Sequence, residues 1–166
     1  SVAVQAQTPS VDGIDYLLDK SNMTATVFGP VPYSGSHLII PEKVVYGGEE
    51  YKVTSIDFGA CSNSSTLVYV DMPFVTSVGR DVFSGCSNLA YVNMPSVTSV
   101  NQKAFYGCSS LASVNMSSVT SVGYEAFYGC SSLASVNMPS VTSVGDRAFA
   151  SCSSLASVDM PSVTGI

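Results

Sequence analysis

Charge is scarce in this chain, and positive charge is the scarcest kind. Only 11% of the 166 residues are charged, and 6 Lys and Arg stand against 12 Asp and Glu, which gives a net charge of -6. This balance has the wrong sign for binding a phosphate backbone, so we expect no nucleic-acid partner. The length is suited to a single domain with a substantial core.

The sequence also lacks the long apolar run of a membrane-spanning protein. Although 46% of the residues are hydrophobic, they are dispersed, and no uninterrupted stretch approaches the roughly 20 residues needed to cross a bilayer. We therefore expect no transmembrane segment. Residues 1–10 contain the small-residue pattern Val4-Gln5-Ala6 without a basic or long apolar region before it. We interpret them as either a disordered tail or the remnant of a removed signal peptide.

Groups suited to catalysis are few. The chain has one histidine, His37, and it contains no G-x-S-x-G, H-E-x-x-H or G-x-x-x-x-G-K motif. Any pair of a nucleophile and a base would have to use His37, in surroundings rich only in Ser and Tyr. We therefore expect no enzyme activity, no catalytic residue and no cofactor.

The most informative feature present is an internal repeat. Thirteen residues, AFYGCSSLASVNM, occupy positions 104–116 and occur again, letter for letter, at 126–138. The same step of 22 residues connects columns of Phe, Leu, Val, Met and Cys. These columns include Phe83, Phe105, Phe127 and Phe149; Leu67, Leu89, Leu111, Leu133 and Leu155; and Cys86, Cys108, Cys130 and Cys152. A fixed period of this length is typical of a solenoid.

Each unit is predicted to contain one short strand. In the segment LAYVNMP, apolar residues at Leu89, Val92 and Met94 predict a strand centred on residues 91–94 that ends at Pro95. Because successive units run in the same direction, their strands must pair in parallel, and about 17 residues remain for each return path.

The return path is predicted to contain a corner and then a short helical turn. Gly, Asn or Asp recurs at the corner, where we expect a positive φ: Asp57, Gly79, Asn101, Gly123 and Gly145. Segments such as DVFSGC and KAFYGC follow, and their Phe and Cys side chains are expected to point inward. In stacked coils each large buried side chain contributes roughly 1.5 to 3 kcal/mol.

The repeat resembles the BspA-like, Treponema-type leucine-rich repeat, a family of bacterial and protist surface proteins. The pattern L-x-x-V-x-M-P-x-V-T-S-V-G-x-x-A-F-x-x-C-S-S recurs in five units from Ser55 to Thr164. The resemblance implies a leucine-rich repeat solenoid, a right-handed coil with a parallel β ladder. It also implies a secreted or cell-surface, adhesin-like protein that binds an extracellular or host protein or glycan. The first unit departs from the pattern, with Cys61 at the Phe position and Ser64 at the Cys position.

The two ends of the repeat region differ, because a predicted cap lies only before the first repeat. Residues 11–54 are interpreted as an N-terminal β cap, with strands in GIDYLL, TATVF, HLIIP and YKVTSI and a hairpin around Gly47 and Gly48. Residues 55–166 hold the five repeats, and no polar cap follows them. We expect either a longer repeat array or self-association of the last coil. Self-association would use Leu155, Val158, Met160 and Val163.

The predicted binding site is the exposed side of the strand ladder. Polar residues occupy one outward position of the units: Asp71, Asn93, Asn115, Asn137 and Asp159. They could form a hydrogen-bonded ladder or contact a ligand. Tyr69 and Tyr91 are the better contact candidates because each is aromatic with a polar tip. Tyr106 and Tyr128 could form a second aromatic strip. The alternative function for the whole chain is a structural spacer that binds no ligand of its own.

The column of cysteines suggests a metal or disulfide site at first sight. A straight column of thiols cannot surround one ion, so no zinc site is expected. The spacing of neighbouring rungs would allow disulfides, but inward-facing Cys between apolar columns acts more economically as a small buried hydrophobe. We therefore expect free thiols.

Overall fold

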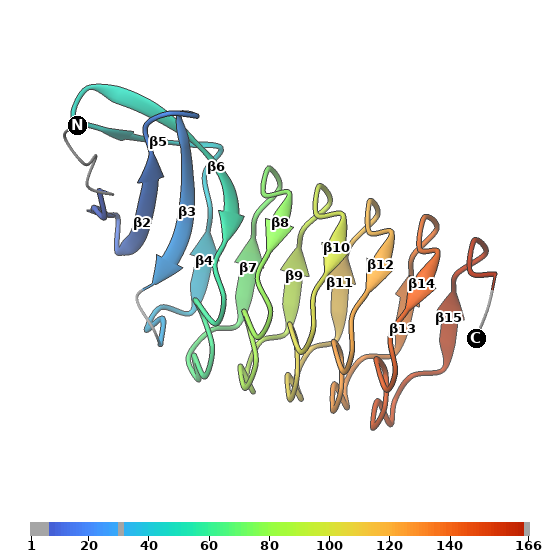
Figure 1. The fold of residues 1–166 in the computed structure, drawn as a ribbon. Helices are drawn as coiled ribbons and strands as arrows, with labels where there is room; N and C mark the ends of the chain where they lie inside the picture. The colour runs from blue at the N-terminus through green and yellow to red at the C-terminus, as the bar shows by residue number, and fades with distance from the viewer. Residues whose placement is uncertain (1–6, 30–31, 165–166) are drawn as a thin grey trace.

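The computed structural model describes residues 7–29 and 32–164, and within these ranges it contains strands and turns but no helix. Figure 1 shows a β-rich N-terminal region followed by coils stacked along one axis. The predicted solenoid with a parallel β ladder is therefore confirmed. The signal-peptide interpretation of residues 1–6 falls outside the described residues. Residues 7–10 differ from the expected disordered tail, because Gln7 bridges Leu18 and Ser10 pairs with Asp15.

The N-terminal region forms a sheet in the order β1-β2-β3-β6-β5, with β8 also paired to β6. Its strands are β1 (Ser10–Val11), β2 (Ile14–Asp19), β3 (Thr24–Gly29), β5 (Lys43–Tyr46), β6 (Glu49–Ile56) and β8 (Ser77–Val78). The predicted hairpin is confirmed, because β5 and β6 are antiparallel around Gly47 and Gly48, both of which have positive φ. Strand β6 runs across the predicted boundary at residue 54, so the cap and the repeats share one sheet.

The repeats build two further sets of parallel strands, on opposite sides of each coil (Figure 1). One set is β4 (His37–Ile39), β7 (Tyr69–Asp71), β9 (Tyr91–Asn93) and β11 (Ser113–Asn115), followed by the separate pair β13 (Ser135–Asn137) and β15 (Ser157–Asp159). The other set is β10 (Ser99–Val100), β12 (Ser121–Val122) and β14 (Ser143–Val144). The pairing of β12 with β14 holds the coils together where β11 and β13 are not paired.

Like residues lie over one another inside the coils. The phenylalanine rings of Phe83, Phe105, Phe127 and Phe149 stack with centroid separations of 5.4, 5.1 and 5.2 Å. The first three rings are fully buried, as are the leucines beside them. Burial decreases in the last described coil, where Val158 is 43% exposed and Leu155, Met160 and Val163 are partly buried. The stacked columns therefore form one continuous core.

The predicted helical turns are wrong, and the hydrogen bonds explain why. In the second repeat the N–H groups of Asp81, Phe83 and Gly85 donate to carbonyls of the next coil at 2.8 to 3.1 Å, while those of Ser84 and Cys86 close turns at 3.1 Å within their own coil. After its first turn, an α-helix needs each successive N–H to bond to a carbonyl inside the segment. Because every second peptide group serves the neighbouring coil, the segment forms successive turns.

The predicted corner glycines also have a different role from the one expected. Gly79, Gly123 and Gly145 do not have positive φ, which falls two residues later, at Asp81, Lys103, Glu125 and Arg147. The glycines instead lie directly on the backbone of the preceding coil: a Cβ on Gly123 would be 2.7 Å from the Gln102 nitrogen. Close approach of two backbones is therefore what selects glycine here.

The first unit keeps the repeat geometry despite its different residues. Cys61 and Ser64 are both buried, at the positions of Phe and Cys in later units. The carbonyl of Cys61 accepts a hydrogen bond from the Cys86 thiol, as the carbonyl of Phe83 does from Cys108. Ser64 accepts a hydrogen bond from the Tyr33 backbone N–H at 2.7 Å. The polar side chain is thus satisfied inside the core.

The five cysteines are free thiols, as expected. Cys86, Cys108, Cys130 and Cys152 each donate a hydrogen bond to a backbone carbonyl of the preceding coil, at 3.0 to 3.2 Å. Burial raises the pKa of Cys61 to about 12 and that of Cys86 to about 11, from an ordinary value of 9.0. These thiols are therefore protonated, unreactive parts of the core at neutral pH.

Replacing Gly123 with Ala tests the close approach of the backbones. The added methyl would meet backbone atoms of residues 101 and 102 at 2.7 to 2.8 Å, so we expect a loss of roughly 1 to 3 kcal/mol in the free energy of unfolding, measured by urea denaturation. The exposed Ser118→Ala is the control, with an expected change within about 0.5 kcal/mol. A Gly123→Ala variant as stable as the control would contradict the close packing.

The buried thiols predict that stability decreases in alkali. An unfolded thiol releases its proton near pH 9, while those of Cys61 and Cys86 are held to about pH 12 and 11. Between these values the folded state binds more protons, so the free energy of unfolding falls as pH rises; below pH 9 these thiols cause no change. A pKa difference of one corresponds to about 1.4 kcal/mol.

Urea denaturation at pH 8 to 11 measures this decrease, and Cys86→Ala isolates the thiol contribution from that of the tyrosines. We expect the decrease in the free energy of unfolding to be smaller in the variant, by roughly 1 to 3 kcal/mol over the range. Equal slopes in the two proteins would mean that the Cys86 thiol is not protected by folding.

Candidate binding face

We use the name ladder face for the outward side of β4, β7, β9, β11, β13 and β15. The face exists because side chains alternate along each strand, so the central Val or Leu of each strand points into the core and its two neighbours point outward. Strand pairing is in register, with His37 opposite Tyr69, Tyr69 opposite Tyr91 and Asp71 opposite Asn93. Equivalent residues of successive strands therefore form straight files across the face.

The first file is aromatic for three strands. The rings of Tyr69 and Tyr91 stack with centroids 5.4 Å apart and planes 17° apart, and the His37 ring lies 5.6 Å from that of Tyr69. His37 is exposed, and both tyrosines are partly exposed. Partial burial raises the pKa of the Tyr69 hydroxyl, with Asp71 adding to the effect. The rings thus form a rigid surface with polar edges.

Sequence reasoning did not place His37 in this file. It treated His37 only as a candidate base, although HLIIP has the form of a repeat strand. Aligning Leu38 with Val70 would have placed His37 on Tyr69, which is the register observed. Nearby, the Ser36 hydroxyl lies 3.0 Å from His37 Nδ1. The histidine stands on the open ladder face.

The second file is polar and linked by hydrogen bonds in part. The Asn93 amide donates to Asp71 and the Asn115 amide donates to Asn93, each at 2.8 Å. This chain of bonds fixes the outward amides of Asn93, beside Tyr91, and of Asn115 on the next strand. Within the described ranges no side-chain bond links Asn137 to either neighbour, and β13 begins a separate pair of strands there. Asn137 and Asp159 are both exposed.

A second aromatic group lies on the turns, as the sequence suggested. The rings of Tyr106 and Tyr128 stack at 5.0 Å, with Lys103 over the first ring and Arg147 over the second at 5.4 and 5.1 Å. Between the two cations the Glu125 side chain, only 7% exposed, contacts Arg147 at 3.0 Å and Lys103 at 3.7 Å. Charges of alternating sign therefore connect three coils beside the tyrosines.

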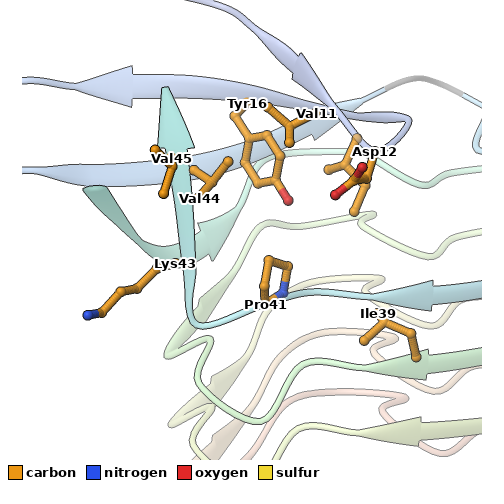
Figure 2. A pocket seen from close by; sticks show the side chains of 9 residues that line it. Val11, Asp12, Tyr16, Ile39, Pro41, Lys43, Val44 and Val45 are labelled. Carbon is orange, nitrogen blue, oxygen red and sulfur yellow. The ribbon is translucent and has the colours of Figure 1, made fainter. Parts of the chain in front are cut away.

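A hollow of about 350 Å³ lies beside the first strand of the ladder. No sequence pattern predicts it, because its walls come from two stretches of chain, residues 11–16 and 39–45. The lining residues are Val11, Asp12, Ile14, Tyr16, Ile39, Pro41, Lys43, Val44 and Val45. Figure 2 shows the Tyr16 hydroxyl and the Asp12 carboxylate directed toward the space above Pro41, while Lys43 points away. Burial, together with Asp12, raises the pKa of Tyr16 to about 12.

In the part of the chain that the structure describes, no three His, Cys, Asp or Glu side chains are grouped so as to hold a metal ion. No helix within the same ranges has the length and apolar character needed to cross a membrane.

Solved structures similar to the chain are bacterial leucine-rich repeat proteins. A leucine-rich cell surface protein of Faecalibacterium prausnitzii has 31% identity and a TM-score of 0.85, over 98% of this chain and 45% of that one. A leucine-rich repeat protein of Bacteroides ovatus has 32% identity and a TM-score of 0.82, over 92% and 41%. The T. pallidum leucine-rich repeat protein has 27% identity and a TM-score of 0.80, over 92% and 71%.

The chain thus spans less than half the length of the first two of these proteins. No curated protein matches it. The family described as BspA type Leucine rich repeat region matches residues 52–166, in 6 copies where the sequence analysis distinguished five units. Proteins with these repeats are generally not enzymes. On its repeat pattern, its strand register and this match, the chain belongs to the BspA-type leucine-rich repeat family.

Proposed function

We propose that this chain is a non-catalytic binding module that recognises an extracellular protein or glycan through the ladder face. The observation that carries the proposal is the aromatic file of His37, Tyr69 and Tyr91 beside the polar file of Asp71 and Asn93. Stacked aromatic rings present a large apolar surface, and the neighbouring amides supply hydrogen-bond donors and acceptors. Proteins and glycans both carry apolar patches beside hydrogen-bonding groups, so this face is complementary to either class of ligand.

Rigidity also supports a binding role for these residues. Each ring is held by its neighbours, and the Asn93 and Asn115 side chains are oriented by hydrogen bonds. Groups that are already ordered lose little conformational entropy when a ligand binds. We place the contact at His37, Tyr69, Asp71, Tyr91, Asn93 and Asn115, with Asn137 and Asp159 extending it along the face.

The proposed function also implies a cellular location for this chain. The Faecalibacterium prausnitzii protein is called a cell surface protein, and by analogy we propose that this chain is secreted or attached to the cell surface. Self-association of the last described coil through Leu155, Val158, Met160 and Val163 stays a prediction, which their partial exposure motivates.

A double replacement of Tyr69 and Tyr91 by Ala tests the ladder face. Ligands would first be identified on arrays of glycans and host extracellular proteins, and their affinity would be measured by surface plasmon resonance. We expect the double variant to lose about tenfold or more in affinity, because buried aromatic side chains commonly contribute about 2 kcal/mol each at an interface.

The matched control is the double replacement of Tyr106 and Tyr128 by Ala, since these rings form a second stacked pair on the turns. We expect it to bind with unchanged affinity. If only the control variant lost binding, the tyrosines of the turns would be the site instead. No ligand on either array would support the alternative of a structural spacer.

A further inference from the structure

We infer that the hollow beside β4 is a binding site for an extended peptide, which adds to the ladder as a further strand. The inference goes beyond the proposed function, because it concerns the edge of the ladder and a different class of contact. It rests on three observations: the open edge of β4, the strands that surround the hollow, and the residues that line it.

The first observation is that β4 is the last strand of its sheet, with β7 on one side and no described strand on the other. Toward β7, the Ile40 N–H donates to Asp71 and the Ser36 carbonyl accepts from Tyr69. Backbone groups of a strand alternate between its two edges, so those of His37 and Ile39 face the open edge. The His37 carbonyl accepts from the Tyr33 hydroxyl at 3.0 Å. Among residues 7–29 and 32–164, no group bonds to the N–H or C=O of Ile39, which therefore face the open edge as sites for a further strand.

The second observation concerns the arrangement of strands around the hollow. Strands β1 and β5 are the two ends of the N-terminal sheet, and β4 is an end of the ladder sheet. All three contribute residues to the hollow: Val11 from β1, Ile39 from β4, and Lys43 to Val45 from β5. Unpaired strand edges are templates for strand addition. A peptide lying in the hollow is therefore beside β4 and among residues of both sheets, whose side chains Figure 2 shows around it.

The third observation is the chemistry of the lining, which is suited to alternating side chains. Ile39 and Val45 are 53% and 59% exposed, Val11 and Pro41 extend this apolar surface, and the buried Val44 also lines the hollow. Lys43 is paired with Glu50 at 3.0 Å, whereas Asp12 is exposed and no ion pair involves it among the described residues. The hollow is thus apolar with one negative group at its rim. An extended peptide with apolar residues at alternate positions and one Lys or Arg near Asp12 matches it.

Selection from a library of random 12-residue peptides displayed on phage, with the whole chain immobilised, tests the inference. We expect the enriched peptides to carry apolar residues at alternate positions and a basic residue. Their affinity, measured by fluorescence polarisation, should fall about tenfold or more in Ile39→Pro, which lacks the N–H that donates to the peptide. Ile39→Val keeps that N–H and should bind as the parent does. Proline is tolerated on an edge strand.

Methylation of the peptide itself provides a test that is independent of folding. Methylating the amides that face β4 should abolish binding, while methylating the alternate amides should leave it unchanged. Failure to enrich any peptide, or equal binding by Ile39→Pro and by both methylated peptides, would overturn the inference. The Tyr69→Ala, Tyr91→Ala double variant should still bind the peptide, so this site and the proposed ladder-face site can fail separately.

Discussion

The structure depends on the sharing of backbone hydrogen bonds between neighbouring coils. In each return path, alternate N–H groups leave their own segment and bond to the next coil, as Phe83 does with Ala104 and Phe105 with Ala126. These bonds fix the vertical spacing of the coils, and the ring centroids of the buried phenylalanines follow it at 5.1 to 5.4 Å. A single coil keeps only the short turn bonds within itself, such as that from the Ser84 N–H to the Asp81 carbonyl, and buries little alone, so stability is a property of the stack.

The same spacing creates the candidate binding surfaces. Because strands pair in register, any residue that recurs at an outward position is brought within contact of its equivalents, as in the stacking of Tyr69 on Tyr91. The ladder face begins at β4, the first strand of the ladder. Since His37 and Ile39 occupy the two outward positions of β4, the aromatic file gains a ring and the polar file begins with an apolar side chain. The ladder face and the hollow consequently meet at Ile39.

Much of this fold can be predicted from the sequence, because a period of 22 residues fixes which residues stack. The strands, the inward columns, the free thiols and the hairpin at Gly47 and Gly48 all follow from local pattern and repetition. The return path could not be predicted in the same way. Its turns depend on bonds to the next coil, and the role of Gly123 depends on the backbone beneath it. The hollow depends on how β1, β4 and β5 come together, which no single segment encodes.

The alternation of charge beside Tyr106 and Tyr128 favours one stacking order of the nearly identical coils. Equivalent positions carry Asp81, Lys103, Glu125 and Arg147, and Glu125 contacts the cations of both adjacent coils. If a coil were skipped during folding, residues of the same sign would be stacked at the spacing of one rung, as Asp81 and Glu125 would be without the coil of Lys103. Such like-charge contacts disfavour the wrong order. The correct order of the coils is thereby encoded in a few charged residues of the turns, because the core is almost the same in every unit and does not distinguish one order from another.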